Sequence, residues 1–90
     1  MRKKGPSAEQ IKRLTKYLKA QRYSEAKKLA TLLTIKFPAH QYAWKALGAA
    51  LGQMGRSAEA VVANRRSVEL APRDAESHYN LGLNLQKLLH

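Results

Sequence analysis

The chain has 90 residues, and its 17 lysines and arginines against 6 aspartates and glutamates give it a formal net charge of +11. A hydrophobic fraction of 44% is that of a folded globular chain, which excludes wholesale disorder and leaves room for one small domain. The absence of cysteine excludes a disulfide-stapled fold and a thiolate metal site, and every apolar run is too short to span a bilayer. We therefore expect a protein that does not insert into membranes and that works in the reducing cytoplasm.

The positive charge is concentrated in the first third of the chain. Residues 1–36 contain eleven lysines and arginines but only Glu9 and Glu25, a balance of +9, whereas residues 37–90 carry +2. Such an asymmetry predicts an acidic partner, such as nucleic acid, anionic lipid or an acidic protein surface. A solvated basic face that only keeps the chain soluble explains the same composition, so both interpretations stay open.

The first helix is expected just after a basic arm, residues 1–6, which we interpret as flexible. Ser7 and Gln10 have the spacing of a capping box, in which each side chain bonds to the backbone of the other. From there apolar residues recur at spacings of three and four as far as Leu18. This spacing predicts a helix that fades around residues 20–22.

The second and third helices are expected on either side of a proline. Ser24 is a good N-cap, and helical spacing continues from it to Phe37, where Pro38 ends the helix. A third helix is expected over residues 41–54, because Gly55 can adopt the left-handed conformation that terminates helices. The alternation of two residues that is typical of strands is missing.

The fourth and fifth helices complete the fold that we expect. The fourth covers residues 57–70 and is closed by Pro72, and the fifth follows Asp74, a good N-cap. Connections of about three to six residues make sequential helices antiparallel neighbours. The sequence therefore predicts an all-α fold of five antiparallel helices, namely two helical hairpins and a C-terminal helix, in one domain over residues 7–90.

An internal repeat with a period of 34 residues underlies this pattern. It aligns Glu25 with Glu59, Ala26 with Ala60, Pro38 with Pro72, Leu47 with Leu81, Gly48 with Gly82, and Leu51 with Leu85. A glycine inside a helix costs about 1 kcal/mol relative to alanine. We therefore expect Gly48 and Gly82 to be notches where another helix approaches closely, with Ala26 and Ala60 serving the same purpose on the facing helices.

These residues resemble the tetratricopeptide repeat family. Its pattern is matched in the middle repeat, residues 41–74, by Trp44, Leu47, Gly48, Leu51, Ala60 and Pro72. The half repeat over residues 75–90 keeps His78, Leu81, Gly82 and Leu85, and the first repeat, residues 7–40, keeps Tyr17, Ala26 and Pro38. Asn64 and Ser67 depart from the pattern, where an aromatic residue and alanine are usual. We expect a loose spot there, in the second hairpin.

The resemblance implies an α-solenoid whose first helices line a concave surface that binds a protein or peptide. The groove residues that it implies are Ile11, Thr15, Leu18, Tyr42, Lys45, Ala49, Tyr79, Asn80 and Leu83. We expect Tyr42 and Tyr79 to act as anchors, because tyrosine offers a large area at low entropic cost. Packing of both rings against neighbouring helices is the open alternative.

Two ligand sites known in the family are not expected to be complete. Ile11, Thr15 and Ala46 stand where the clamp for a peptide carboxyl terminus has polar and basic residues. Asn80 is the single rung of the asparagine ladder found in the repeats of O-linked N-acetylglucosamine transferases, because Lys12 and Ala46 replace the earlier rungs. The chain is nevertheless similar overall to repeat arrays that precede bacterial transferase domains, so it is also interpreted as a piece of a larger protein.

Neither catalysis nor a cofactor is expected. The six acidic residues are scattered, and His40, His78 and His90 are far apart in the sequence. No glycine-rich phosphate loop or metal-ligand spacing is present. The expected function is therefore protein binding by a non-enzyme, without metal or cofactor.

Two alternatives concern the ends of the fold. A basic patch in the first hairpin is a candidate surface for nucleic acid or another acidic partner; it comprises Lys12, Arg13, Lys16, Lys19, Lys27 and Lys28. The last helix either caps the core or is half of a truncated repeat. In the second case Leu81, Leu85 and Leu88 would seek a partner, and self-association would follow.

Overall fold

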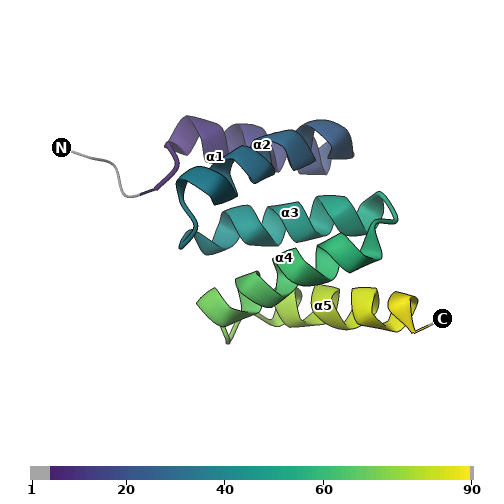
Figure 1. The fold of residues 1–90 in the computed structure, drawn as a ribbon. Coiled ribbons are helices and arrows are strands. Elements are labelled where there is room, and N and C mark those ends of the chain that lie inside the picture. Colours follow the sequence, from purple (N-terminus) through teal and green to yellow (C-terminus); the bar gives the residue numbers. More distant parts are fainter. Residues whose placement is uncertain (1–4, 90) are drawn as a thin grey trace.

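The computed structural model describes residues 5–89, which form five α-helices and no strand. These are α1 (Ala8–Lys19), α2 (Tyr23–Lys36), α3 (Gln41–Gln53), α4 (Ser57–Leu70) and α5 (Ala75–Leu88). Figure 1 shows the hairpins α1/α2 and α3/α4 stacked side by side, with α5 at the far end. The expected all-α class and helix order are confirmed. Most of the basic arm lies outside the described residues.

Side-chain caps start α1 and α5 as expected. The Ser7 hydroxyl accepts a hydrogen bond from the Gln10 backbone N–H at 3.1 Å, and the Gln10 side chain accepts one from the Ser7 N–H at 2.9 Å. Asp74 caps α5 by accepting from the backbone N–H of Glu76. The prediction that Ser24 caps α2 is wrong, because that helix begins at Tyr23 and makes no side-chain cap hydrogen bond.

The turn inside each hairpin has the same geometry in both repeats. Gln21 and Gly55, which are 34 residues apart, both have a positive φ, of 58° and 76°. The arginine that follows each of them, Arg22 or Arg56, donates its backbone N–H to the carbonyl five residues earlier, at 2.8 and 2.9 Å. This pattern is a Schellman motif; its left-handed residue is Gly55 in one turn, as the sequence predicted, and Gln21 in the other.

The turns between helical pairs also repeat. Trp44 Nε1 donates to the Pro38 carbonyl at 2.8 Å, and His78 Nε2 lies 2.7 Å from the Pro72 carbonyl. The C-cap residues of α2 and α4, Phe37 and Ala71, have nearly the same backbone conformation. Their φ and ψ are −134° and 68° at Phe37 and −141° and 77° at Ala71. The 34-residue repeat of the sequence is therefore also a repeat of the backbone.

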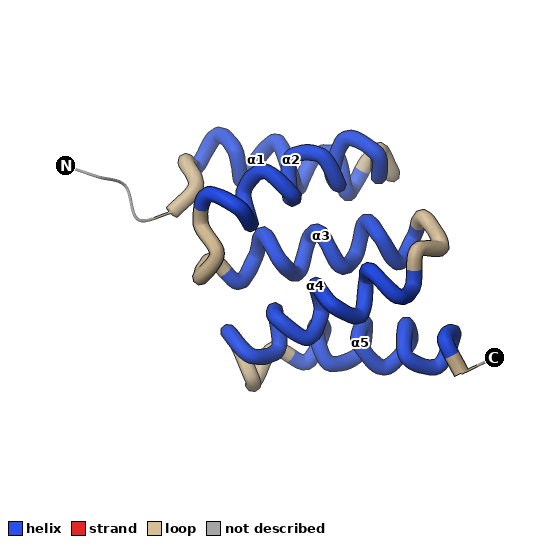
Figure 2. The backbone as a smooth tube through the Cα atoms, viewed as in Figure 1, coloured by secondary structure: helices blue, strands red, loops and turns tan. Residues whose placement is uncertain are grey.

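The helices form two layers. Each helix packs against the next one, and α3 also contacts both α1 and α5, whereas the backbones of α2 and α4 do not approach each other closely. Figure 2 shows α1, α3 and α5 behind α2 and α4. The two layers therefore present two different faces, one built on α1, α3 and α5 and the other on α2 and α4.

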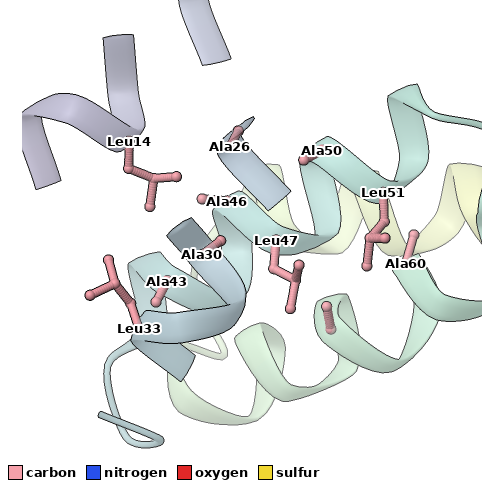
Figure 3. Packing of buried hydrophobic residues seen from close by; sticks show 11 residues of the cluster. Leu14, Ala26, Ala30, Leu33, Ala43, Ala46, Leu47, Ala50, Leu51 and Ala60 are labelled. Carbon is pink, nitrogen blue, oxygen red and sulfur yellow. The ribbon is translucent and has the colours of Figure 1, made fainter. Parts of the chain in front are cut away.

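The core is rich in alanine and centred on α3. Figure 3 shows its buried side chains converging from α1 to α4. They are Leu14, Ala26, Ala30, Leu33, Ala43, Ala46, Leu47, Ala50, Leu51, Ala60 and Ala63. Trp44 is half-buried and packs against this cluster. Small side chains let the helix backbones approach closely, as the repeat pattern predicted for Ala26 and Ala60.

The two repeated glycines have different surroundings. A Cβ built on Gly48 would lie 2.1 Å from the Oδ1 atom of Asn64 on α4, so this position is the expected notch. A Cβ on Gly82 would meet nothing within 4 Å. The expectation of a close approach at Gly82 is wrong, because no described helix covers that side of α5 as α4 covers α3.

Candidate functional site

The face built by α1, α3 and α5 carries a groove of about 240 Å³, which we call the α1–α3–α5 groove. Its lining is Leu18, Tyr23, Tyr42, Lys45, Ala46, Ala49, Gln53, Glu76 and Asn80. Five of these residues belong to the groove implied by the family resemblance: Leu18, Tyr42, Lys45, Ala49 and Asn80. Side chains from four helices therefore converge on one site.

Tyr42 is held in place by its neighbours. Its hydroxyl lies 2.6 Å from the Thr15 hydroxyl, which joins α3 to α1. Its ring packs against the hydrophobic core. The interpretation of Tyr42 as a ring packed against an adjacent helix therefore applies, and its remaining exposed edge forms part of the groove wall.

Lys45 is engaged in ion pairs within the groove. Its Nζ atom lies 2.9 Å from Asp74 Oδ2 and 2.8 Å from Glu76 Oε1. Partial burial by itself lowers the pKa of the Lys45 amine, but the hydrogen bonds to Glu76 and Asp74 outweigh it and raise that pKa above its usual value. Lys45 therefore stays charged, but its charge is already neutralised by the carboxylates of Glu76 on α5 and of Asp74, the N-cap residue of α5.

Asp74 is the centre of a polar network that joins α3, α4 and α5. Its Oδ2 atom accepts hydrogen bonds from Gln41 Nε2 at 2.7 Å and from the Ser77 hydroxyl at 2.9 Å. Gln41 also donates to the Ser67 hydroxyl, which lies 2.7 Å from that of Ser77. The hydrogen bond from Lys45 is the largest effect that lowers the pKa of Asp74 from 3.8 to about 2, and those from Ser77 and Gln41 add to it.

The remaining groove residues spread over the surface. Leu83 lines a hollow of about 80 Å³ that continues the groove, since the two share Ala49, Gln53 and Asn80. Tyr79 lines a different hollow, on the outer side of α5 next to Gly82, and the residue is 65% exposed. Ile11 is half-buried on α1 outside the groove lining.

The basic residues of the first hairpin divide into two groups. Lys12, Arg13 and Lys16 line a cleft of about 320 Å³ with Glu9, Tyr17, Ala20 and Arg22, which we call the basic cleft. Lys27 lies elsewhere, on a groove between α2 and α4 that includes Trp44 and Val62. Lys19 and Lys28 are exposed outside both. None of the six basic residues forms an ion pair within the described part of the chain.

Among the residues of these sites that sequence reasoning missed, three have large side chains. Tyr23 joins the groove from the start of α2, and Tyr17 and Arg22 join the basic cleft. Arg22 aligns with Arg56 in the 34-residue repeat, and each pairs with the glutamate three residues later. That recurrence was the available signal for an ordered Arg22, and the helical spacing of four between Arg13 and Tyr17 was the available signal for Tyr17.

Comparisons of the chain with protein-family models, with curated proteins and with solved structures gave no match. Within residues 5–89, no three histidine or acidic side chains lie close enough together to hold a metal ion. None of the five helices combines the length and the apolar character that crossing a bilayer requires.

Proposed function

We propose that this chain is a tetratricopeptide-type interaction module that binds an extended peptide segment in the α1–α3–α5 groove. The observation that carries the proposal is the convergence of side chains from four helices on one open groove of about 240 Å³. Membership of the family is part of the proposal. It is supported by the sequence signature and by the 34-residue recurrence of the turns.

The groove offers both apolar contact and free polar groups. Leu18 and Ala49 supply apolar surface for a side chain of the peptide. The side-chain amides of Gln53 and Asn80 make no hydrogen bond within residues 5–89. A primary amide both donates and accepts, so it matches the backbone of an extended peptide without requiring a particular sequence. Lys45, in contrast, is already occupied by Asp74 and Glu76.

The test is selection of peptides from a phage-displayed library of random 12-residue segments, followed by titration of the best peptide by fluorescence anisotropy. Gln53→Ala with Asn80→Ala is expected to weaken binding by at least about tenfold, since two hydrogen bonds of about 1 kcal/mol each are lost. Val62→Ala, an exposed change on α4, is the matched control and should leave the affinity unchanged.

Equal losses in the groove variant and the control would remove the groove from the proposal. Lys45→Glu is not a suitable test variant, because it would place a third carboxylate beside Asp74 and Glu76 and disturb the fold itself. Circular dichroism of every variant separates loss of binding from loss of helix.

We propose further that the protein is not an enzyme, needs no cofactor and works in the cytoplasm. The groove is lined by residues already bonded to one another or by amides and apolar groups, which suits binding better than proton transfer. The lack of cysteine suits a reducing compartment. A role as one part of a longer repeat array, such as those preceding transferase domains, is compatible with the open outer side of α5.

A further inference from the structure

The outer side of α1 presents cations that no other part of the described chain neutralises. Lys12, Arg13 and Lys16 line the basic cleft, whose sole acidic lining residue is Glu9. The volume of the cleft, about 320 Å³, is at the lower end of the range typical of small-molecule sites. We propose that the basic cleft binds single-stranded nucleic acid, on a surface separate from the α1–α3–α5 groove.

The spacing of the cations suits a chain of phosphates. Lys12, Lys16 and Lys19 follow one another at helical spacings of four and three. At a rise of about 1.5 Å per residue they cover about 10 Å along α1. A row of lysines on one helix therefore matches a short run of a phosphate backbone better than it matches a single anion.

An aromatic ring and a guanidinium plane stand at one end of this row. The guanidinium of Arg22 lies over the Tyr17 ring, 5.6 Å from its centroid. The Arg22 side chain is 57% exposed, and an ion pair with Glu25 orients it. Bases of single strands stack on arginine planes and on aromatic rings, which paired bases in a duplex cannot do. The stack therefore favours a single strand.

An anionic membrane is a poorer fit to this surface. Helices that lie on membranes insert large apolar side chains next to their cations. The exposed large apolar residues of the described chain are Leu32, Ile35, Met54, Val62, Tyr79, Leu83, Leu88 and Leu89, none of them on α1. An acidic protein would use the same lysines but would gain little from the exposed plane of Arg22.

The test is a titration of a fluorescein-labelled 12-nucleotide oligo(dT) with the full chain, followed by anisotropy at 50 and 200 mM salt. Contacts with about three phosphates predict a slope of about −2 for the logarithm of affinity against that of salt concentration. Replacing Lys12, Arg13 and Lys16 together by glutamine should weaken binding at 50 mM salt by at least about tenfold and reduce the slope to about −0.7, because one phosphate contact, that of Lys19, remains.

A matched triple variant removes the same charge elsewhere. It replaces Arg65, Arg73 and Lys87 by glutamine; these three cations are exposed on α4, in the turn before α5 and on α5. Its affinity for the oligonucleotide should stay within about threefold of the parent chain. Equal losses in the two triple variants would show that only net charge matters and would overturn the site.

Arg22→Lys tests the stacking step, because it keeps the charge and removes the plane. It should weaken oligo(dT) binding and leave binding of inorganic polyphosphate unchanged. An unchanged affinity for oligo(dT) would overturn the assignment to nucleic acid. Tighter binding to phosphatidylserine vesicles or to polyglutamate than to oligo(dT) would also overturn it. The groove variant with Gln53→Ala and Asn80→Ala should bind oligo(dT) normally, so this inference and the proposed function fail separately.

Discussion

At the scale of single residues, Asp74 does three tasks at once. It caps α5, pairs with Lys45 of α3 and accepts a hydrogen bond from Gln41. Its pKa falls from 3.8 to about 2 because these partners favour the ionised form. A carboxylate whose pKa is lowered by folding stabilises the folded state above pH 3.8, and this contribution is lost as the pH falls towards 2.

The change Asp74→Asn isolates the charge, because asparagine is also a good N-cap. We expect the variant to unfold at a temperature about 4–8 °C lower near pH 7, which corresponds to about 1 kcal/mol in a domain of this size. The difference should shrink between pH 4 and pH 2, where the parent chain loses the same charge. Thermal unfolding followed by circular dichroism over this pH range measures both effects.

Glu76→Gln is the control for this prediction. It removes the other carboxylate of Lys45, but the Glu76 side chain is 67% exposed and bonds to no other residue through its carboxylate in the described chain. An exposed ion pair contributes less than about 1 kcal/mol. If Glu76→Gln lowered the unfolding temperature as much as Asp74→Asn, or if the difference persisted at pH 2, the pairing assigned to Asp74 would be wrong.

At the scale of helices, the two hairpins pack with different chemistry although their backbones repeat. Leu33 and Ala43 are buried between α2 and α3, whereas Ser67 and Ser77, their equivalents 34 residues later, meet through a hydrogen bond between α4 and α5. Ala30 is likewise replaced by Asn64, which is buried with neither side-chain polar atom hydrogen-bonded. An unsatisfied buried amide costs about 1–3 kcal/mol. Asn64 is therefore a destabilising position within the second hairpin, where the sequence predicts a loose spot.

Gly48→Ala and Gly82→Ala form a matched pair at this scale. Alanine at Gly48 would force the enclosed Asn64 side chain to move, and we expect a loss of about 1–3 kcal/mol of stability. Alanine at Gly82 meets open space and should stabilise α5 by about 0.5–1 kcal/mol. Chemical denaturation measures the free energy of unfolding, which should fall in Gly48→Ala and rise in Gly82→Ala.

A double variant identifies the cause of the expected loss at Gly48. Asn64→Ala removes the side chain that occupies the space of the new methyl group. Combined with it, Gly48→Ala should cost little or become stabilising, so the two changes are coupled in a double-mutant cycle. Additive effects would mean that Asn64 is not what requires a glycine at position 48.

At the scale of the whole molecule, the last helix leaves an apolar surface open. Tyr79 is 65% exposed and lines a hollow beside Gly82, and Leu83 lines the same hollow. The described part of the first third, residues 5–36, has eight lysines and arginines against two glutamates, a balance of +6, and its helices α1 and α2 lie at the opposite end of the stack. Two copies that join through α5 keep their basic hairpins farthest apart, which minimises repulsion. We therefore expect a tail-to-tail dimer in which α5 of each copy lies next to the two-fold axis.

Sedimentation over a range of protein concentrations tests this dimer. We expect Tyr79→Lys to raise the dissociation constant at least about tenfold, since it removes an aromatic contact and places two like charges near the axis. Val62→Lys, with a similar exposure of 67% on α4, should have no effect. Added salt should strengthen the dimer by screening the repulsion between copies. A monomer at all concentrations would exclude the dimer.

The sequence by itself determined the helices and the repeat. Their order follows from helical spacing interrupted by Pro38 and Pro72, and the caps at Ser7 and Asp74 fix two starts. Ser24 misled the prediction because Gln21 turns the chain early enough for α2 to begin at Tyr23. These are local effects, in which the backbone of a residue depends on its near neighbours.

Only the tertiary structure decided which side chains meet. The sequence predicted a close helix contact at both Gly48 and Gly82. In the structure α4 covers Gly48, whereas no part of the described chain covers Gly82. The sequence placed Lys45 in the groove without naming a partner, whereas Asp74 and Glu76, which lie about thirty residues away in sequence, neutralise its charge. Spacing along a chain gives the face of a helix on which a residue lies, but its neighbours depend on how helices distant in sequence pack together.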